Sequence, residues 1–558
     1  MRAAVVVAGS LAAVLGCGGG TGGTDDALEP ERPAPAEVAA AVTARIEATP
    51  SVRDTIRSVG DAGADLRILY AGETDQLIWF ANSTPRPVLD SLLDALEHAD
   101  RHGLDPAAYD AEGLRAARRA LDSLPRTAER LAALDVGASL GALQYFRALA
   151  VGQVVPAAMG FAMQPAREGV DVPALVRAAR DAGTLTPVVD SILPVRPGYR
   201  RMVKALAAYR ELAARGEPAT VPNLTASRSK VESGGTWDGV PAVRERLMRL
   251  GDLAGDADTG AVYDSVLVGA VERFQARHGL NPDGVIGPAT VAAMNVPLAE
   301  RVEQLEFALE RLRWFPALAD QRAVVVNLPF YELDAYDHPT GEPVLESRVV
   351  IGERGDHATP SFTDSIGYLI FRPYWFIPET IAAQEIVGPA LKDSLYLANN
   401  QYEVIRRYTD DAEVLEPTPE RLDSVARGKL FLRQQPGPLN SLGRVKFMFP
   451  NSNDIYLHDT PARSLFGRDR RAFSHGCVRV DRPAELAVWL LADAKKWPRD
   501  SVDAAMRAET PRTVGLKRKV PVVLFYVTAM VEGDGTVRFA EDPYGHDARL
   551  KAVLGRRS

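Results

Sequence analysis

The chain is organised around two short stretches, Ile455-Tyr-Leu-His-Asp-Thr-Pro461 and Phe473-Ser-His-Gly-Cys-Val-Arg-Val480. They place a histidine, His458, and a cysteine, Cys477, on either side of a connection rich in arginine. A thiol becomes a nucleophile at neutral pH when a base or a cation lies beside it, because the thiolate is the reactive form. His458 is the candidate base and Cys477 the candidate nucleophile. The alternative is a buried structural cysteine beside an unrelated histidine.

Gly476 directly precedes the cysteine. A residue without a side chain lets the backbone turn tightly and approach a bound carbonyl group. The amides of Gly476 and Cys477 would then form an oxyanion hole. No cluster of Cys and His in the sequence has zinc-ligand spacing. We therefore expect no metal and no organic cofactor, since a covalent thioester can carry the chemistry.

His458-Asp-Thr-Pro461 together with Ser474-His-Gly-Cys-Val-Arg479 resembles the signature of the L,D-transpeptidases that carry a YkuD-type catalytic domain. The resemblance is to the large multi-domain subfamily that builds the bacterial cell wall, and it extends from about residue 60 to about residue 535. It implies the following site residues. The catalytic residues are Cys477, His458, Ser474 and Gly476, and the substrate-binding residues are Arg479, His475 and Tyr456. For His475 a structural role is an equal alternative.

The connection between the two candidate catalytic residues has a marked charge. From His458 to Arg479 it carries five arginines and two aspartates: Arg463, Arg468, Arg470, Arg471 and Arg479 against Asp459 and Asp469. On an acidic chain this pattern predicts a local positive field that favours the Cys477 thiolate and attracts peptides bearing carboxylates. A solvated basic loop is the alternative for the middle arginines.

The resemblance implies an activity in cell wall biogenesis and the maintenance of cell shape. Cys477 would attack the carbonyl of the third residue of a tetrapeptide stem, D-alanine would leave, and the amine of another stem would resolve the thioester into a 3-3 cross-link. Peptidoglycan stem peptides are thus the expected partners, and carbapenem-type β-lactams the expected inhibitors. An L,D-carboxypeptidase or hydrolase of the same fold and a non-catalytic wall-binding lipoprotein stay open as alternatives.

Length and composition agree with a protein of several domains. The chain has 558 residues, which is too long for one core. Its net charge of −8 argues against a general nucleic-acid binder. The only cysteines are Cys17 and Cys477. A disulfide between them is conceivable, but each has a better individual explanation.

The N-terminus has the pattern of an exported lipoprotein. A short positive start precedes an apolar run that is too short to span a bilayer, which is typical of a signal peptide. The run ends in Val14-Leu15-Gly16-Cys17, which resembles a lipobox, so Cys17 is the expected lipidated residue. A stretch rich in glycine and proline follows and predicts a flexible tether. We expect a periplasmic protein held at the outer membrane by a lipid anchor; secretion with an unused cysteine is the alternative.

Hydrophobic periodicity and motifs divide the rest of the chain. Leu89, Leu92, Leu93 and Leu96 lie on one face of a helix and open a helical region. Residues 274–290, with Phe274-Gln275 and Gly287-Pro288-Ala-Thr290, resemble a peptidoglycan-binding domain of the three-helix type. Short β-branched and aromatic segments from Ala323 onward predict strands. They indicate a β-sandwich, which is consistent with the fold of the transpeptidase family. Residues 378–440 interrupt that rhythm and predict a helical lid over the catalytic groove.

The expected fold class is therefore α+β with several domains. The expected division is a signal peptide at 1–16, a tether at 17–50, a helical scaffold at 51–220, a peptidoglycan-binding domain at 235–296, a scaffold return helix at 297–320, a catalytic domain at 321–540 with its lid at 378–440, and a tail at 541–558.

Overall fold

The computed structural model describes residues 32–51, 56, 60–72, 77–195, 197–255, 260–318, 321–338, 340–492 and 495–555. The predicted signal peptide, Cys17 and the first part of the predicted tether lie outside these ranges. Within them, none of the helices combines the length and the hydropathy that crossing a membrane requires.

The N-terminal part is a helical scaffold built around one long buried helix. Its elements are α1 (Pro35–Ala48), α2 (Ala62–Tyr70), β1 (Phe80–Ala81), β2 (Thr84–Pro85), α3 (Pro87–Glu97), η1 (Ala99–His102), η2 (Pro106–Tyr109), α4 (Ala111–Ser123), α5 (Ala128–Val151), η3 (Pro156–Met159), α6 (Val172–Ala182), α7 (Thr186–Ile192) and α8 (Pro197–Ala214). Helix α5 lies at the centre and is contacted by α1 to α4, α6 and α7. Its residues are therefore buried on nearly all sides.

Helix α1 corrects the predicted tether, which was to run to residue 50. It packs on α5 through Val42 and Ile46, each 9% exposed, with Val38 beside them. These residues are spaced by four, so they share one face of a helix. The proline- and alanine-rich composition concealed this spacing, because only three apolar branched residues carry the packing.

The chain returns to the scaffold after the second domain. Helix α12 (Leu298–Trp314) lies against α8 and contacts α5. Its Glu310 is 1% exposed and accepts hydrogen bonds from the amides of Gln153 and Val154, at 2.5 and 2.9 Å, and from Arg313 at 2.7 Å. A buried carboxylate needs such partners. The scaffold is therefore discontinuous in sequence.

Between α8 and α12 the chain forms a small helical domain with its own core. Its helices are α9 (Val240–Arg249), α10 (Ser265–Arg277) and α11 (Pro288–Met294). Phe274 is fully buried in that core. Gln275 donates to the carbonyl of Val285 at 2.9 Å and accepts from the amide of Gly284 at 2.9 Å. The motif residues thus build the turn between α10 and α11.

Strands dominate after residue 320. The sheet contains β3 (Ala323–Asn327), β4 (Glu332–Tyr336), β5 (Leu345–Gly352), β6 (Phe362–Phe371), β11 (Val445–Met448), β12 (Leu457–His458), β13 (Ala472–Ser474), β14 (Val478–Val480) and β15 (Arg512–Phe525), with η5 (Arg463–Gly467), α17 (Pro483–Leu491) and α18 (Arg499–Arg507) beside it. The strand order is β13-β5-β14-β12-β11-β6-β15-β3-β4, and β4 also pairs with β5. Eight strands from β5 round to β4 therefore form a closed ring.

This closure differs from the predicted β-sandwich of two stacked sheets. Strand β5 makes it possible, because its first half pairs with β4 and its second half with β14. A pairing between strands that are distant in order depends on tertiary geometry, which a pattern of alternating residues does not contain.

The predicted lid is a small α+β unit rather than a purely helical segment. It comprises β7 (Trp375–Ile377), α13 (Glu379–Ile381), the π-helical turn η4 (Ala382–Ile386), α14 (Val387–Lys392), α15 (Tyr396–Asn399), β8 (Tyr402–Ile405), β9 (Val414–Leu415), α16 (Pro419–Ala426) and β10 (Phe431–Gln434). Four strands pair in the order β7-β10-β8-β9. Ile377, Leu422 and Leu432 contribute to a separate core. The short strands were missed because two to four residues give little alternation.

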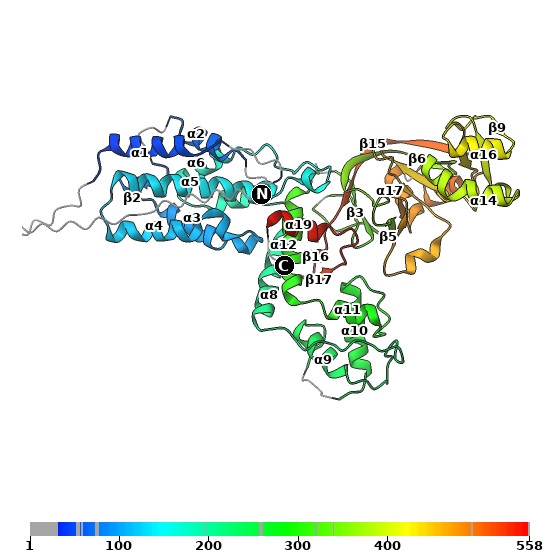
Figure 1. The fold of residues 1–558 in the computed structure, drawn as a ribbon, viewed down its shortest axis with the longest axis horizontal. Coiled ribbons are helices and arrows are strands. Elements are labelled where there is room, and N and C mark those ends of the chain that lie inside the picture. Colours follow the sequence, from blue (N-terminus) through cyan, green and yellow to red (C-terminus); the bar gives the residue numbers. More distant parts are fainter. Residues whose placement is uncertain are drawn as a thin grey trace, which may run out of the picture.

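The C-terminal segment is structured as well. It forms the hairpin β16 (Ala529–Val531) and β17 (Val537–Phe539) and then α19 (His546–Leu554). The predicted tail is therefore mostly a helix, and it contacts α12 and η3 of the scaffold. Figure 1 shows α19 beside α12, between the scaffold helices and the strand-rich domain, with α9 to α11 on a third arm and the inserted unit at the end farthest from α5.

Candidate active site

Two adjacent strands bring the candidate base and nucleophile together. Strand β12 ends at His458, and β14 begins directly after Cys477. The two strands pair in parallel, with Leu457 opposite Val478 and His458 opposite Arg479. The amide of Val478 donates to the carbonyl of Tyr456 at 3.1 Å. His458 and Arg479 are thus separated by twenty residues in the sequence but occupy neighbouring positions in the sheet.

The turn that carries the cysteine is held by Ser474. The Ser474 hydroxyl donates to the carbonyl of Cys477 at 2.5 Å and accepts from the amide of Gly476 at 3.2 Å. Gly476 has a φ of +117°, which side chains rarely tolerate. Ser474 is buried, and its two hydrogen bonds fix the shape of the turn. Gly476 supplies the backbone conformation that the turn requires.

His458 is held in one tautomer. Its ring is 4% exposed, and Nδ1 lies 2.5 Å from the carbonyl oxygen of Asp459. A carbonyl only accepts, so Nδ1 carries the proton and Nε2 is left with a free lone pair. Burial lowers the pKa of His458 to about 3, and the charges of Arg479 and Lys446 add to this effect. The imidazole is therefore neutral and able to accept a proton.

Cys477 carries a free, half-buried thiol. Burial raises its pKa to about 11, although hydrogen bonds from the backbone and hydroxyl of Tyr456 act in the opposite direction. The thiol also lies 3.7 Å from the carbonyl oxygen of Asp454. At neutral pH the resting site thus contains a thiol and a neutral imidazole, and a proton must move during attack.

The arginines of the connection do not act together on Cys477 as the sequence predicted. Arg463 pairs with Asp459 and Asp481. Arg471 donates to main-chain carbonyls at Arg468 and in the turn before β4. Of the cations in the connection, Arg479 has an electrostatic interaction with Cys477. The pKa of the thiol rises because burial outweighs the hydrogen bonds from Tyr456 and the charge of Lys446.

Arg479 is half-buried, and its Nε has no hydrogen-bond partner among the described residues. Burial also lowers the pKa of its guanidinium. A buried donor without an acceptor is costly, so it is suited to receive an oxygen from outside the chain. Tyr456 lies next to His458, with ring centroids 5.7 Å apart in an edge-on arrangement.

His475 contacts the inserted unit. Its Nε2 lies 2.6 Å from Oε1 of Glu385 in η4, and its ring is 4.5 Å from that of His357. Asp410, also in the insertion, interacts with Lys446, which in turn interacts with Cys477. The insertion therefore approaches the candidate site at two points. For His475, this geometry favours the structural alternative over substrate binding.

Three residues near the site were given no role from the sequence. Lys446 lies opposite His458 on β11, Thr359 donates to the carbonyl of Gly476 at 2.7 Å, and Tyr544 contacts Thr359. Thr359 precedes a proline in a pair that resembles the family pattern, but neither this pair nor the sequence around Lys446 indicated a role. Tyr544 lies in the segment predicted to be a tail. Long-range pairing alone brings these three residues to the site.

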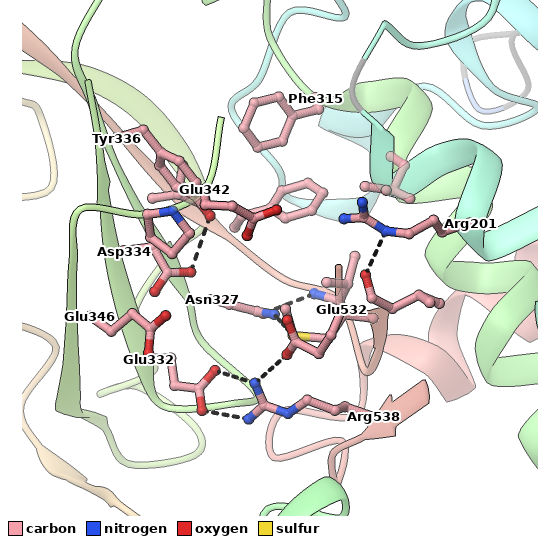
Figure 2. A pocket seen from close by; sticks show the side chains of 18 of the residues that line it. Arg201, Phe315, Asn327, Glu332, Asp334, Tyr336, Glu342, Glu346, Glu532 and Arg538 are labelled. Carbon is pink, nitrogen blue, oxygen red and sulfur yellow. Dashed lines mark hydrogen bonds and ion pairs between the residues drawn. The ribbon is translucent and has the colours of Figure 1, made fainter. Parts of the chain in front are cut away.

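A separate cavity of about 630 Å³ lies between α8, α12 and the strands β3 to β5. Figure 2 shows its charged side chains, with Arg538 between Glu332 and Glu532 and with Asp334 near Tyr336. Neither Cys477 nor His458 is among the described residues that line it. Across the described part of the chain, no group of three or more His, Cys, Asp or Glu side chains is arranged to hold a metal ion.

Comparison with protein families gives three matches. Residues 321–530 match the L,D-transpeptidase catalytic domain of the YkuD type, residues 64–206 a scaffold domain, and residues 238–294 a domain described as "Putative peptidoglycan binding domain". A protein of Haemophilus influenzae named "Putative L,D-transpeptidase" is 30% identical over 248 residues. That alignment covers 44% of this chain and 49% of the relative, so the chain spans about half the length of the curated relative it matches.

Two solved structures are similar at a lower level. An L,D-transpeptidase from Xylanimonas cellulosilytica is 18% identical, with a TM-score of 0.17, and the match covers 55% of this chain and 98% of the other. An L,D-transpeptidase from Stackebrandtia nassauensis is 14% identical, with a TM-score of 0.22, and the match covers 53% and 95%. At these TM-scores neither structure supports a conclusion about this chain. The family matches nevertheless place an L,D-transpeptidase catalytic domain of the YkuD type in this chain, together with a peptidoglycan-binding domain.

Proposed function

We propose that this chain is an L,D-transpeptidase that forms 3-3 cross-links in peptidoglycan through a thioester on Cys477. The observation that carries the proposal is the pairing of β12 with β14, which places a neutral imidazole with a free Nε2 on the strand next to the thiol. The family matches to a transpeptidase domain and a peptidoglycan-binding domain support the substrate class.

Acylation begins with attack by Sγ of Cys477 on the carbonyl between the third stem residue and terminal D-alanine. His458 Nε2 takes the thiol proton as the carbon–sulfur bond forms, and the carbonyl oxygen becomes an oxyanion. The Cys477 amide is the expected donor to that oxyanion. When the carbon–nitrogen bond breaks, His458 returns the proton to the nitrogen of D-alanine, which leaves, and a thioester remains.

Deacylation reverses the roles with a second stem. The side-chain amine of that stem attacks the thioester carbonyl, and His458 accepts a proton from the amine. Collapse of the second oxyanion breaks the carbon–sulfur bond, and the proton returns to the sulfur. The low pKa of His458 favours the return of the proton in each half-reaction, because burial and the charges of Arg479 and Lys446 destabilise the imidazolium.

Arg479 is the proposed contact for a substrate carboxylate or main-chain carbonyl, since its Nε has no partner among the side chains and main-chain groups described. Tyr456 is proposed to contact the reacting groups, because its hydroxyl hydrogen-bonds the thiol. Both groups interact with the proposed nucleophile, so they would orient the donor stem.

The inserted unit of residues 378–440 is proposed to act as a lid. Its Glu385 pairs with His475, two residues before the nucleophile, and its Asp410 lies near Lys446. A lid at this place would exclude water and favour amine transfer over hydrolysis. A periplasmic location and a lipid anchor at Cys17 are part of the same proposal; they rest on the sequence pattern at the N-terminus.

Mass spectrometry of muropeptides after incubation with purified protein tests the function. We expect 3-3 dimers and free D-alanine from tetrapeptide stems. Tripeptides without dimers, also in the presence of added amine acceptor, would favour the carboxypeptidase. Absence of any product, together with failure of a β-lactam probe to label Cys477, would leave a wall-binding protein without this activity.

A further inference from the structure

Tyr544 reaches the catalytic domain from the C-terminal segment. It lies after the last strand of the chain, on the approach to α19. Its hydroxyl donates to the carbonyl of Gly352 at 2.8 Å and accepts from the amide of Thr359 at 3.1 Å. Tyr544 therefore joins two points of the catalytic domain that lie on either side of the turn between β5 and β6.

Thr359 continues this connection to the cysteine turn. It is 2% exposed. Its hydroxyl accepts from the amide of Gly352 at 2.9 Å and donates to the carbonyl of Gly476 at 2.7 Å. A hydroxyl has one proton to donate, so that proton is committed to Gly476.

The contact with Gly476 sets the direction of the Cys477 amide. The peptide unit between Gly476 and Cys477 is planar and trans, so its C=O and N–H point in opposite directions. When Thr359 holds the C=O, the N–H must point away from Thr359. Within the described part of the chain the Cys477 amide has no acceptor, which leaves it available to an oxyanion.

The turn needs this restraint because of its backbone. Gly476 adopts a φ of +117°, and a glycine peptide can rotate more freely than any other. Ser474 holds the amide of Gly476 and the carbonyl of Cys477, but not the peptide unit between them. Among the residues that the structure describes, Thr359 holds that peptide unit through its hydrogen bond to the carbonyl of Gly476.

Tyr544 is held at its amide by the catalytic domain, and the helix that follows it is held by the scaffold. The Tyr544 amide donates to the hydroxyl of Tyr526, directly after β15, at 3.1 Å. Three residues further on, Asp547 pairs with Arg311 of α12, and Arg549 donates to the carbonyl of Ala158 at 2.8 Å. The segment from Tyr544 to α19 thus connects the scaffold with the catalytic turn.

We propose that Thr359 and Tyr544 are positioning residues that orient the Cys477 amide as the oxyanion donor, so that the C-terminal segment is part of the catalytic apparatus. The proposal rests on the proposed function, because it requires an acyl group on Cys477. Neither side chain touches the substrate; each acts through the peptide unit of Gly476.

The test compares acylation with alkylation in four variants. The parent and all four variants carry Cys17→Ser, so that Cys477 is the thiol that reacts. Thr359→Val and Tyr544→Phe remove the two hydroxyls with little change of shape, and Thr359→Ser keeps a hydroxyl. Thr363→Val is the matched control, since the buried Thr363 hydroxyl has no hydrogen-bond partner among the described residues. Acylation is measured with a tetrapeptide stem and with p-nitrophenyl acetate, and alkylation with iodoacetamide, which forms no oxyanion.

Thr359→Val should lower kcat for acylation by about tenfold to a hundredfold. This is no more than the decrease in kcat that follows when a direct oxyanion donor is removed. Tyr544→Phe should lower it by about three- to tenfold, because its effect is indirect. KM, the alkylation rate and the pH profile of alkylation should be unchanged, and Thr359→Ser and Thr363→Val should behave like the parent.

If alkylation and acylation slow equally in Thr359→Val, the substitution has disrupted the turn itself. If acylation is unchanged, the hydrogen bond from Thr359 to Gly476 does not contribute to catalysis. Either result overturns the inference. The two acyl donors separate it from the proposed function. Reduced ester acylation with preserved alkylation supports the inference even where the parent ignores the stem. Stem acylation by the parent, with unaltered ester acylation in Thr359→Val, overturns it and leaves the proposed function standing.

Discussion

His458 and Arg479 face each other as partners in the parallel pairing of β12 and β14. Partners in register project from the same face of a sheet. Lys446 is the partner of His458 on the other side, in β11. The imidazole therefore lies between two cations. Burial lowers its pKa to about 3, and the charges of Arg479 and Lys446 add to this effect. The base of the proposed mechanism is neutral because it is buried beside two cations.

Replacement of Cys477 tests the nucleophile. Cys477→Ala should abolish release of D-alanine and formation of dimers, since the described part of the chain has no other cysteine to form the thioester. Cys477→Ser should lose at least roughly a hundredfold in rate, because a hydroxyl is far less acidic than a thiol. The half-buried position predicts a change in unfolding free energy within about 1 kcal/mol for the alanine variant, measured by denaturant unfolding. Dimers formed by a folded alanine variant would exclude the thioester mechanism.

The pH dependence distinguishes a neutral thiol–imidazole pair from a preformed ion pair. Between the pKa of His458, about 3, and that of Cys477, about 11, both groups stay in the form that the mechanism needs. Single-turnover acylation should therefore vary little across the neutral range. Alkylation of Cys477 by iodoacetamide should instead rise by about tenfold per pH unit, because only thiolate reacts. A plateau of alkylation near pH 7 would indicate an ion pair and contradict this account.

The pair of Glu385 and His475 connects the insertion to the cysteine turn, at 2.6 Å. Glu385→Gln weakens that contact, so we expect the share of hydrolysed stems to rise relative to cross-linked stems by about two- to fivefold, which a loss of about 0.5 to 1 kcal/mol would produce. Glu413→Gln is the matched control, because Glu413 forms an exposed pair with Arg406 in the same unit.

Replacing residues 378–440 by a short Gly/Ser linker extends the test. Cys477 should stay reactive toward a small thiol probe, while transfer falls and hydrolysis rises. A ratio of transfer to hydrolysis that does not move in either variant would show that the insertion does not gate the reaction.

Lipidation of Cys17 remains a prediction from the sequence, because this residue lies outside the described ranges. Cys17→Ser should release the protein from membranes or block its maturation. Fractionation and mass spectrometry of the N-terminal peptide measure both effects. An unmodified N-terminal peptide in the parent, with unchanged fractionation of the variant, would refute the anchor.

Asp334, in the cavity of Figure 2, gives a stability test away from the site. Burial and the neighbouring Glu332 and Glu346 raise its pKa from 3.8 to about 7. Between these values the folded chain retains a proton that the unfolded chain has lost, so this carboxyl makes stability fall as pH rises through the window.

Asp334→Asn cannot ionise and should therefore be more stable than the parent above pH 7, by about 1 to 2 kcal/mol after allowance for its partial exposure. Denaturant unfolding at two pH values measures the difference. Asp423→Asn, at an exposed aspartate on α16, is the control for the removal of a carboxylate. An identical pH dependence of parent and Asp334→Asn would contradict the raised pKa.

Local patterns predicted the elements that local patterns build. The spacing of Leu89, Leu92, Leu93 and Leu96 predicted the buried face of α3, and all four are fully buried. The motif from Phe274 to Thr290 predicted the turn between α10 and α11. Helix α1 and the strands of the insertion were missed, because their packing depends on few residues each. The C-terminal helix was missed because it gains stability from α12, far away in the sequence.

The sequence by itself determined the kinds of residues available for the chemistry, since His458, Ser474, Gly476, Cys477 and Arg479 stand in a recognisable order. Only the tertiary structure decided their states. Burial, with Lys446 and Arg479 placed on either side by strand pairing, kept His458 neutral, and burial kept Cys477 protonated despite the arginines nearby in sequence. Charge and hydrogen bonding depend on distance and on exclusion of water, and both follow from contacts between segments that the chain order separates.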